Sequence, residues 1–150
     1  MLELIPIKRT FEENAAFAAN AGCLDILRMS IDFYKRIGFV FPWIGYFAVA
    51  DGNIVGSAGY KGQPVNNKIE IAYGTNPGFQ HQGIGTEICR QLVVLAHTTD
   101  PNLMITARTL PQENYSTKIL QKNGFNLLGM VWDKDDGNVW EWRFEGHNPY

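Results

Sequence analysis

The sequence has little of what would indicate a secreted, membrane-bound or metal-binding chain. It contains two cysteines, Cys23 and Cys89, which do not have metal-ligand spacing. A disulfide framework and a zinc site are therefore not expected. No apolar run is long enough to cross a bilayer, and Met1 to Thr10 lacks the apolar core and cleavage site of a signal peptide. We therefore expect a reduced chain in the cytoplasm, with no membrane partner.

Neither positive nor negative charge predominates in the sequence. The net charge is −2 and no basic run occurs, so neither nucleic acid nor a membrane surface is an expected partner. The three histidines form no cluster with metal-ligand spacing, and no metal is expected. An apolar content of 45% with 19% charged residues is typical of a globular protein. Without a linker or internal repeat, residues 1–150 are expected to form a single domain.

The N-terminal part predicts one strand followed by two helices. Apolar residues alternate over residues 2–7, which indicates a strand. Residues 12–20 are rich in alanine and predict a helix. Residues 25–37 place apolar side chains at helical spacing, and Gly38 provides a C-terminal stop.

The next part predicts three antiparallel strands. They cover residues 46–50, 54–60 and 69–75, and the first two are joined by an Asp-Gly hairpin turn. Gly56 and Gly59 interrupt the middle strand. Glycine inside a strand indicates a bulge or the close approach of another group.

The C-terminal part alternates helices and strands. Helices are predicted over residues 86–96 and 114–122, and strands over residues 103–107, 126–132 and 138–144. The resulting order, βααβββαβαββ, contains strand–helix–strand units, which need parallel pairing, and hairpins, which need antiparallel pairing. The sequence therefore predicts an α+β fold with a mixed central sheet.

The most informative motif is the run from Gln80 to Thr86, Gln-His-Gln-Gly-Ile-Gly-Thr, which joins a predicted strand to a helix. Its two glycines let the backbone approach a ligand and leave the first helical N–H groups free to face an anion. It lacks the Gly-Lys-Ser/Thr ending of a P-loop and the third glycine of a dinucleotide-binding loop. The functional interpretation is a binding site for phosphate or pyrophosphate, and the alternative is a simple tight turn.

The spacing Gln80-x-x-Gly83-x-Gly85, with Pro77 ahead of it, resembles the signature of the GNAT superfamily of N-acetyltransferases. Residues 110–125 are similar to the late family segment that ends in Lys-x-Gly-Phe, and the ending at residues 131–140 resembles the branch of ribosomal-protein-alanine acetyltransferases. The likeness covers nearly the whole chain. It implies a mostly antiparallel central sheet with helices on both faces.

The resemblance implies acetyl-CoA as the co-substrate. The pyrophosphate would lie on the glycine loop, and the pantetheine arm would pair with the backbone of the preceding strand. Asn114, at the start of the last helix, would contact the pantetheine, although asparagine is also a common helix N-cap. The predicted cofactor-binding residues are Tyr73, Gly74, Thr75, Gln80, His81, Gln82, Gly83, Ile84, Gly85, Thr86 and Asn114.

The resemblance also indicates a base, because an amine must lose a proton before it attacks a thioester. Glu70, between two isoleucines on the strand before the loop, resembles the family's strand glutamate, although an outward-facing, solvated glutamate is the alternative. A backbone N–H within residues 72–75 is the expected oxyanion donor. Many family members carry a tyrosine as thiolate acid where this chain has Leu120, and Tyr115 could substitute only if it faces the cleft.

The function implied is transfer of an acetyl group from acetyl-CoA to a primary amine by direct attack in a ternary complex. The acceptor would be a protein or peptide N-terminus, an amino acid or a small amine. Two alternatives remain open at this stage. One is a non-catalytic acyl-CoA-binding module of the same fold, and the other is a protein-interaction domain with an incidental glycine loop. Association into a homodimer is also left open.

Overall fold

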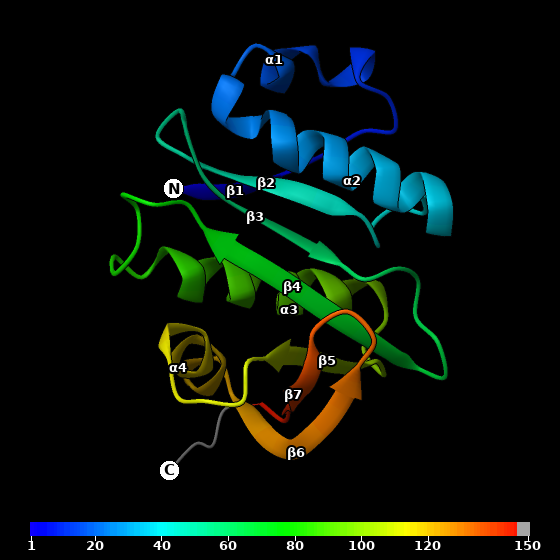
Figure 1. The fold of residues 1–150 in the computed structure, drawn as a ribbon, viewed down its shortest axis with the longest axis vertical. Helices are drawn as coiled ribbons and strands as arrows, with labels where there is room; N and C mark the ends of the chain where they lie inside the picture. Colours follow the sequence, from blue (N-terminus) through cyan, green and yellow to red (C-terminus); the bar gives the residue numbers. More distant parts are fainter. Residues whose placement is uncertain (147–150) are drawn as a thin grey trace.

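Seven strands form one mixed sheet in the computed structural model, which describes residues 1–146 (Figure 1). In space they follow the order β1-β2-β3-β4-β5-β7-β6, and β4 with β5 is the parallel pair of this described sheet. The predicted mixed, mostly antiparallel sheet is therefore confirmed. The strands are β1 Leu2–Pro6, β2 Gly45–Ala50, β3 Asn53–Tyr60, β4 Lys68–Thr75, β5 Met104–Thr109, β6 Phe125–Asp133 and β7 Gly137–Phe144.

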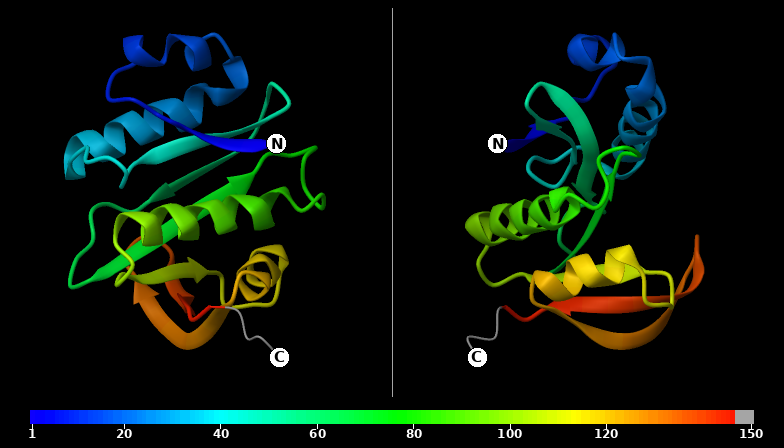
Figure 2. Two further views of the ribbon diagram at one scale, coloured as in Figure 1. Left: turned by 180° about the vertical axis from the view of Figure 1, so that it is seen from behind. Right: turned by 90° about the vertical axis from the view of Figure 1, so that its left-hand side faces the viewer.

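Helices cover both faces of the sheet, as the sequence predicts (Figure 2). The helices α1 and α2 lie on one face, over β1 to β3, and α3 lies on the opposite face. The shorter α4 packs beside α3 and against β6. The bounds are α1 Ala15–Ala18, α2 Leu24–Ile37, α3 Ile84–Thr99 and α4 Tyr115–Lys122, with short 3-10 turns at Glu12–Asn14 and Ala21–Cys23. No helix within the described residues is long and apolar enough to cross a membrane.

The prediction of one continuous helix over residues 12–20 is wrong. Only one α-helical turn, α1, forms there, because the Asn14 side chain binds backbone outside the helix. Its amide oxygen accepts from the N–H of Lys8 at 2.9 Å, and its amide nitrogen donates to the carbonyl of Thr10 at 2.7 Å. Asparagine side chains compete with helical hydrogen bonds in this way. By contrast, α2 matches its prediction closely and ends at Gly38, whose φ is 107°.

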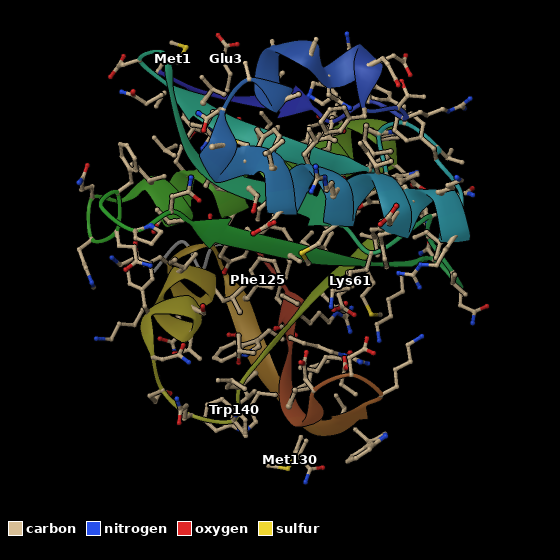
Figure 3. All side chains as sticks on the ribbon, turned by 45° about the horizontal axis from the view of Figure 1, so that its top comes forward. Met1, Glu3, Lys61, Phe125, Met130 and Trp140 are labelled. Carbon is tan, nitrogen blue, oxygen red and sulfur yellow. The ribbon has the colours of Figure 1, made fainter. Side chains whose placement is uncertain are left out.

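The core lies mainly between β4 and α3. Ile69 and Ile71 of β4 are buried on the face that carries Ile88 and Leu92 of α3. The Tyr60 hydroxyl on β3 donates to the carbonyl of Leu92 at 2.7 Å and ties the helix to the sheet. At the far edge, Phe125 at the start of β6 is buried whereas Met130 on the same strand is 57% exposed (Figure 3).

The glycines of β3 serve both purposes that the sequence suggests. The β2–β3 register shifts between Ala48 and Val49, opposite Gly56, which marks a bulge. A Cβ on Gly56 would lie 2.3 Å from the carbonyl oxygen of Gly74 on β4. The absence of a side chain therefore lets β3 and β4 approach closely beside the end of β4.

Pairing between β4 and β5 stops before either strand ends. The last paired residues are Ile71 and Ala107, yet β4 continues to Thr75 and β5 to Thr109. The other side of β4 remains paired with β3 as far as Thr75. Residues Ala72–Thr75 therefore present an edge toward β5 that no described strand covers, here called the unpaired edge of β4.

Candidate active site

The unpaired edge of β4 exposes main-chain groups that could pair with an extended ligand. The carbonyl of Glu70 accepts from the Lys61 N–H, so Glu70 directs its backbone toward β3. Successive residues of a strand alternate in this direction. Tyr73 and Thr75 therefore direct their N–H and C=O groups toward the β5 side, and Gly74 directs its own toward β3. The Tyr73 side chain lies on the α3 face near Cys89, and burial raises its pKa.

The glycine loop leads directly into α3, which begins at Ile84 rather than at Thr86. Gly83 is the N-cap residue, with φ 80°, and no side chain caps the helix. The first bond of the helix runs from the N–H of Glu87 to the carbonyl of Gly83 at 3.1 Å. The amides of Ile84, Gly85 and Thr86 precede that bond, so they form the positive end of the helix dipole.

The two glycines of the motif have different structural causes. Gly83 has open space where a Cβ would project, so its left-handed backbone explains the glycine. Gly85 is buried, and a Cβ there would lie 2.6 Å from Cδ1 of Ile119 and 3.1 Å from Oγ1 of Thr75. Glycine at this position allows the start of α3 to pack closely against α4 and the end of β4.

A cavity of about 500 Å³ lies between the loop, the start of α3 and α4. It brings together several of the predicted cofactor residues with two lysines that the sequence reading missed. Lys118 and Lys122 are four residues apart, so they lie on one face of α4, and this spacing was the signal that could have identified them. The cavity is lined by His81, Gly83, Thr86, Glu113, Asn114, Tyr115, Lys118, Ile119 and Lys122.

The other predicted residues of the loop, Gln80, Gln82, Ile84 and Gly85, do not line this cavity. The Gln80 side-chain amide donates to the carbonyl of Thr75 at 3.4 Å and ties the loop to the unpaired edge of β4. The Gln82 amide donates to the carbonyl of Gly78 at 3.3 Å. Both contacts hold the loop in its observed shape.

The residues at the start of α4 connect that helix to the loop. Asn114 is the N-cap, and its side-chain oxygen accepts from the N–H of Thr117 at 3.1 Å in a capping box. The Tyr115 hydroxyl accepts a hydrogen bond from the N–H of His81 at 3.3 Å. The centroids of the two rings lie 5.0 Å apart. The backbone amide of His81, one of the predicted cofactor-binding residues, therefore already has a hydrogen-bond partner within the protein. Leu120 is completely buried.

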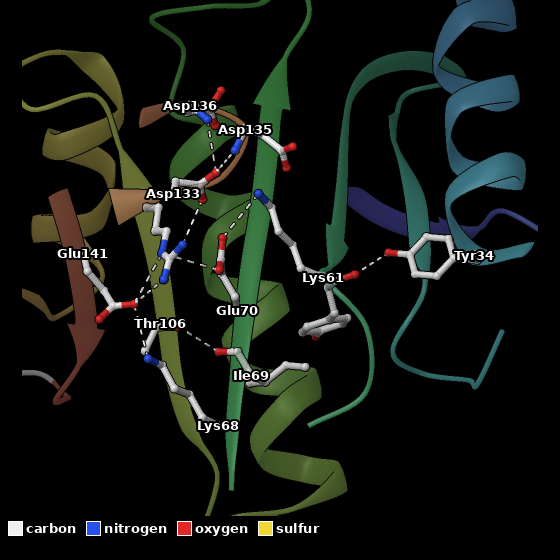
Figure 4. Close-up of polar contacts among 12 residues, drawn as sticks. Tyr34, Lys61, Lys68, Ile69, Glu70, Thr106, Asp133, Asp135, Asp136 and Glu141 are labelled. Atoms are coloured by element: carbon white, nitrogen blue, oxygen red, sulfur yellow. Dashed lines mark hydrogen bonds and ion pairs between the residues drawn. The ribbon is translucent and has the colours of Figure 1, made fainter. Parts of the chain in front are cut away.

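Glu70 lies on the opposite face of the sheet from α3, between the buried Ile69 and Ile71 (Figure 4). Its side chain is 20% exposed. One carboxylate oxygen lies 3.3 Å from Nζ of Lys61, and the other lies 3.8 Å from Nε of Arg108. The carboxylate is thus paired with two cations rather than isolated, which the sequence did not indicate. Among the described residues no group of three potential ligands could hold a metal ion.

The comparisons with known proteins agree with this geometry. A family model described as the acetyltransferase (GNAT) domain matches residues 9–126. No curated protein matches the chain. Among solved structures, the ribosomal L7/L12 alpha-N-protein acetyltransferase RimL with coenzyme A superposes with a TM-score of 0.67, at 15% identity, over 95% of this chain and 92% of that chain.

Two further acetyltransferases share the fold. A chimera of the Vibrio cholerae spermidine N-acetyltransferase SpeG and hSSAT has a TM-score of 0.69 at 14% identity and covers 95% of this chain and 94% of its own. The aminoglycoside acetyltransferase AAC(6')-Ib with coenzyme A has a TM-score of 0.65 at 17% identity and covers 97% and 94%. These likenesses show the fold, and the family match covers most of the chain. The chain therefore belongs to the acetyltransferase (GNAT) domain family, as the glycine signature predicted.

Proposed function

We propose that this protein transfers an acetyl group from acetyl-CoA to a primary amine, by direct attack within a ternary complex. One observation carries the proposal: pairing between β4 and β5 ends beside the uncapped start of α3. Main-chain partners for an extended arm and an anion seat therefore lie next to each other. Glu70 lies a short way back along the same strand, on the opposite face of the sheet.

The CoA pyrophosphate would lie at the first amides of α3, because the positive end of a helix dipole favours anions. Lys118 and Lys122 line the adjoining cavity and supply positive charge. The pantetheine amides would pair with the backbone of Tyr73 and Thr75 at the unpaired edge. Asn114 lines the same cavity, and its side-chain nitrogen is the part that would face pantetheine, because its oxygen caps α4.

Acetyl transfer begins with a neutral amine. A lysine-like amine has a pKa of about 10.4 and an α-amine about 8, so at neutral pH the acceptor must give up a proton. We propose that Glu70 accepts this proton, directly or through a water. The amine nitrogen then attacks the thioester carbon, the carbon–sulfur bond breaks, and CoA leaves as a thiolate. The thiolate takes up the second proton of the attacking nitrogen, so that a neutral amide and the CoA thiol remain. The N–H of Tyr73 faces the unpaired edge and is the proposed oxyanion donor.

The acceptor is proposed as a peptide N-terminus, an amino acid or a small amine. RimL is named for a ribosomal protein and SpeG for spermidine, so structural neighbours include both protein and small-molecule enzymes. Both cysteines are free and buried, which supports the cytoplasm as the proposed compartment.

The test is release of CoA thiol from acetyl-CoA in the presence of a panel of amines, amino acids and peptides. With the preferred acceptor, we expect Glu70→Gln to lower kcat by roughly 100- to 10,000-fold, because the general base is lost. The KM for acetyl-CoA should stay near the wild-type value, since Glu70 lies on the face away from the loop.

Glu3→Gln is the matched control, because Glu3 is exposed on the edge strand β1 (Figure 3). Wild-type turnover by Glu70→Gln at neutral pH would show that Glu70 is not the base. CoA binding without thiol release for any amine would instead indicate a non-catalytic acyl-CoA-binding module.

A further inference from the structure

Arg108 occupies a central position on the face of the sheet that carries Glu70. It is the first residue of β5 after pairing with β4 ends, and its side chain is 27% exposed. Its guanidinium lies among three carboxylates from three different strands, Glu70 on β4, Asp133 on β6 and Glu141 on β7. Figure 4 labels these three carboxylates. One side chain thus connects the proposed base to both strands at the far edge of the sheet.

The strongest of these contacts joins Arg108 to the β6–β7 hairpin. Its Nη1 donates to Oδ2 of Asp133 at 2.9 Å. The other oxygen of Asp133 accepts from the N–H groups of Asp135 at 2.8 Å and Asp136 at 3.2 Å, so Asp133 also shapes the turn. The Asp133 side chain is 9% exposed. Charge-assisted hydrogen bonds in such a shielded place are stronger than exposed ones.

The remaining contacts extend the network along the sheet. Oε1 of Glu141 accepts from Nε and Nη2 of Arg108, both at 3.4 Å. The same oxygen lies 3.3 Å from Nζ of Lys68. Three cations, Lys61, Lys68 and Arg108, therefore face three carboxylates. A planar guanidinium presents several donors in one plane, so lysine could not make the same set of contacts.

We propose that Arg108 is a positioning residue for acetyl transfer: it orients the Glu70 carboxylate and holds the β6–β7 hairpin in place beside it. This inference rests on the proposed function, because it acts through Glu70. The guanidinium lies 3.8 Å from one oxygen of Glu70, and its planar fork restricts where that carboxylate can point.

The test compares Arg108→Met, which keeps bulk and removes the charge, with Arg108→Lys, which keeps the charge and removes the fork. For Arg108→Met we expect kcat/KM for the amine to fall by up to about 100-fold, the size of effect that misplacement of a catalytic group produces. The KM for acetyl-CoA should not change.

Arg108→Lys, which keeps the charge but not the fork, should recover only part of the rate. Arg90→Met is the matched control, since Arg90 also pairs with a carboxylate, Glu87, but on the outer surface of α3. Hydrogen exchange provides a readout besides turnover. The amides of Asp135 and Asp136 should lose protection in Arg108→Met and keep it in Arg90→Met.

Two results would overturn the inference. One is a wild-type kcat/KM in Arg108→Met while Glu70→Gln is inactive, which would leave the proposed function intact. The other is unchanged protection of the turn amides in Arg108→Met, a result that does not depend on any acceptor. If Arg108→Met does not fold, the partial rate expected of Arg108→Lys still decides the question, and a full wild-type rate in that variant would overturn the inference.

Discussion

The Cys89 thiol lies in the interior beneath the proposed cofactor site. The residue has no exposed surface, and burial raises the pKa of its thiol to about 12. Cys23, the N-cap residue of α2, is also buried, and burial raises its pKa as well. Because the thiolate is the reactive form, both side chains should be chemically inert in the folded protein.

We therefore expect neither thiol to react with a disulfide reagent at pH 8 at the rate of a free thiol. Labelling followed by mass spectrometry should show modification of Cys89 only as the protein unfolds in denaturant. The unfolded chain, in which both thiols react, is the control. Rapid modification of Cys89 under native conditions would mean that α3 opens readily, and would contradict the packing described here.

Some side-chain contacts at the candidate site could not be predicted from the sequence. Glu70 was identified from its position before the loop, but its pairing with Lys61 and Arg108 was not. Arg108 is 38 positions away along the chain, and only the parallel register of β4 and β5 brings them together. Asn114 was predicted with both a cofactor role and a capping role, and its side-chain oxygen does cap α4. Its contact with pantetheine stays a prediction.

The packing of α3 against its neighbours depends on the absence of a side chain at Gly85. Because Gly85 has no side chain, the first turn of α3 packs closely against Ile119 on α4 and Thr75 on β4. We expect Gly85→Ala to lower the free energy of unfolding by about 1–3 kcal/mol, the usual cost of overpacking, because the contact with Ile119 is too short for a methyl group. The loss should outweigh the gain in helix propensity.

Denaturant unfolding measures this effect. Gly74→Ala is the control, since a Cβ there meets nothing within 4 Å, and it should leave the free energy of unfolding nearly unchanged. Equal stability of Gly85→Ala and the wild type would show that α3 and α4 can separate without cost.

Elements with strong local signals were predicted well, and those that depend on distant partners were not. The amphipathic α2 and the hairpin at Asp51 and Gly52 agree with the sequence. The helix expected over residues 12–20 is broken because Asn14 binds backbone at Lys8 and Thr10, a contact that no helical pattern reveals. The family resemblance implies that acetyl-CoA binds where two parallel strands separate, but no local pattern indicates that β4–β5 pairing ends at Ile71, because register is set by tertiary packing.

The whole molecule should respond to acid through Asp133. Its pKa is lowered from 3.8 to about 2, first because the Asp135 N–H donates to it, and then because of Arg108 and the Asp136 N–H. A carboxyl with a lower pKa in the folded state stabilises the fold fully above its unfolded value. That contribution is lost as pH falls from 3.8 toward 2.

We therefore expect the denaturant midpoint of the wild type to fall across this pH range. Asp133→Asn should have a lower midpoint at pH 7 and a flatter dependence on pH below 4, because the titrating group is gone. Urea unfolding at pH 7, 4 and 2 measures both. A wild-type midpoint that does not change with acid, or an Asp133→Asn curve parallel to it, would show that Asp133 does not contribute to the pH dependence of stability.

Calorimetric titration with CoA tests the proposed site most directly, in the wild type, Gly83→Asp and Gly52→Asp. Gly83 and Gly52 are matched, with φ of 80° and 79° and open space at the Cβ position. Both variants should be strained alike, but only Gly83→Asp brings a carboxylate to the phosphate seat. We expect saturable binding of one CoA per chain to the wild type and Gly52→Asp, and none to Gly83→Asp. No binding to the wild type at millimolar CoA, or equal binding to all three proteins, would contradict the assignment of the glycine loop to CoA.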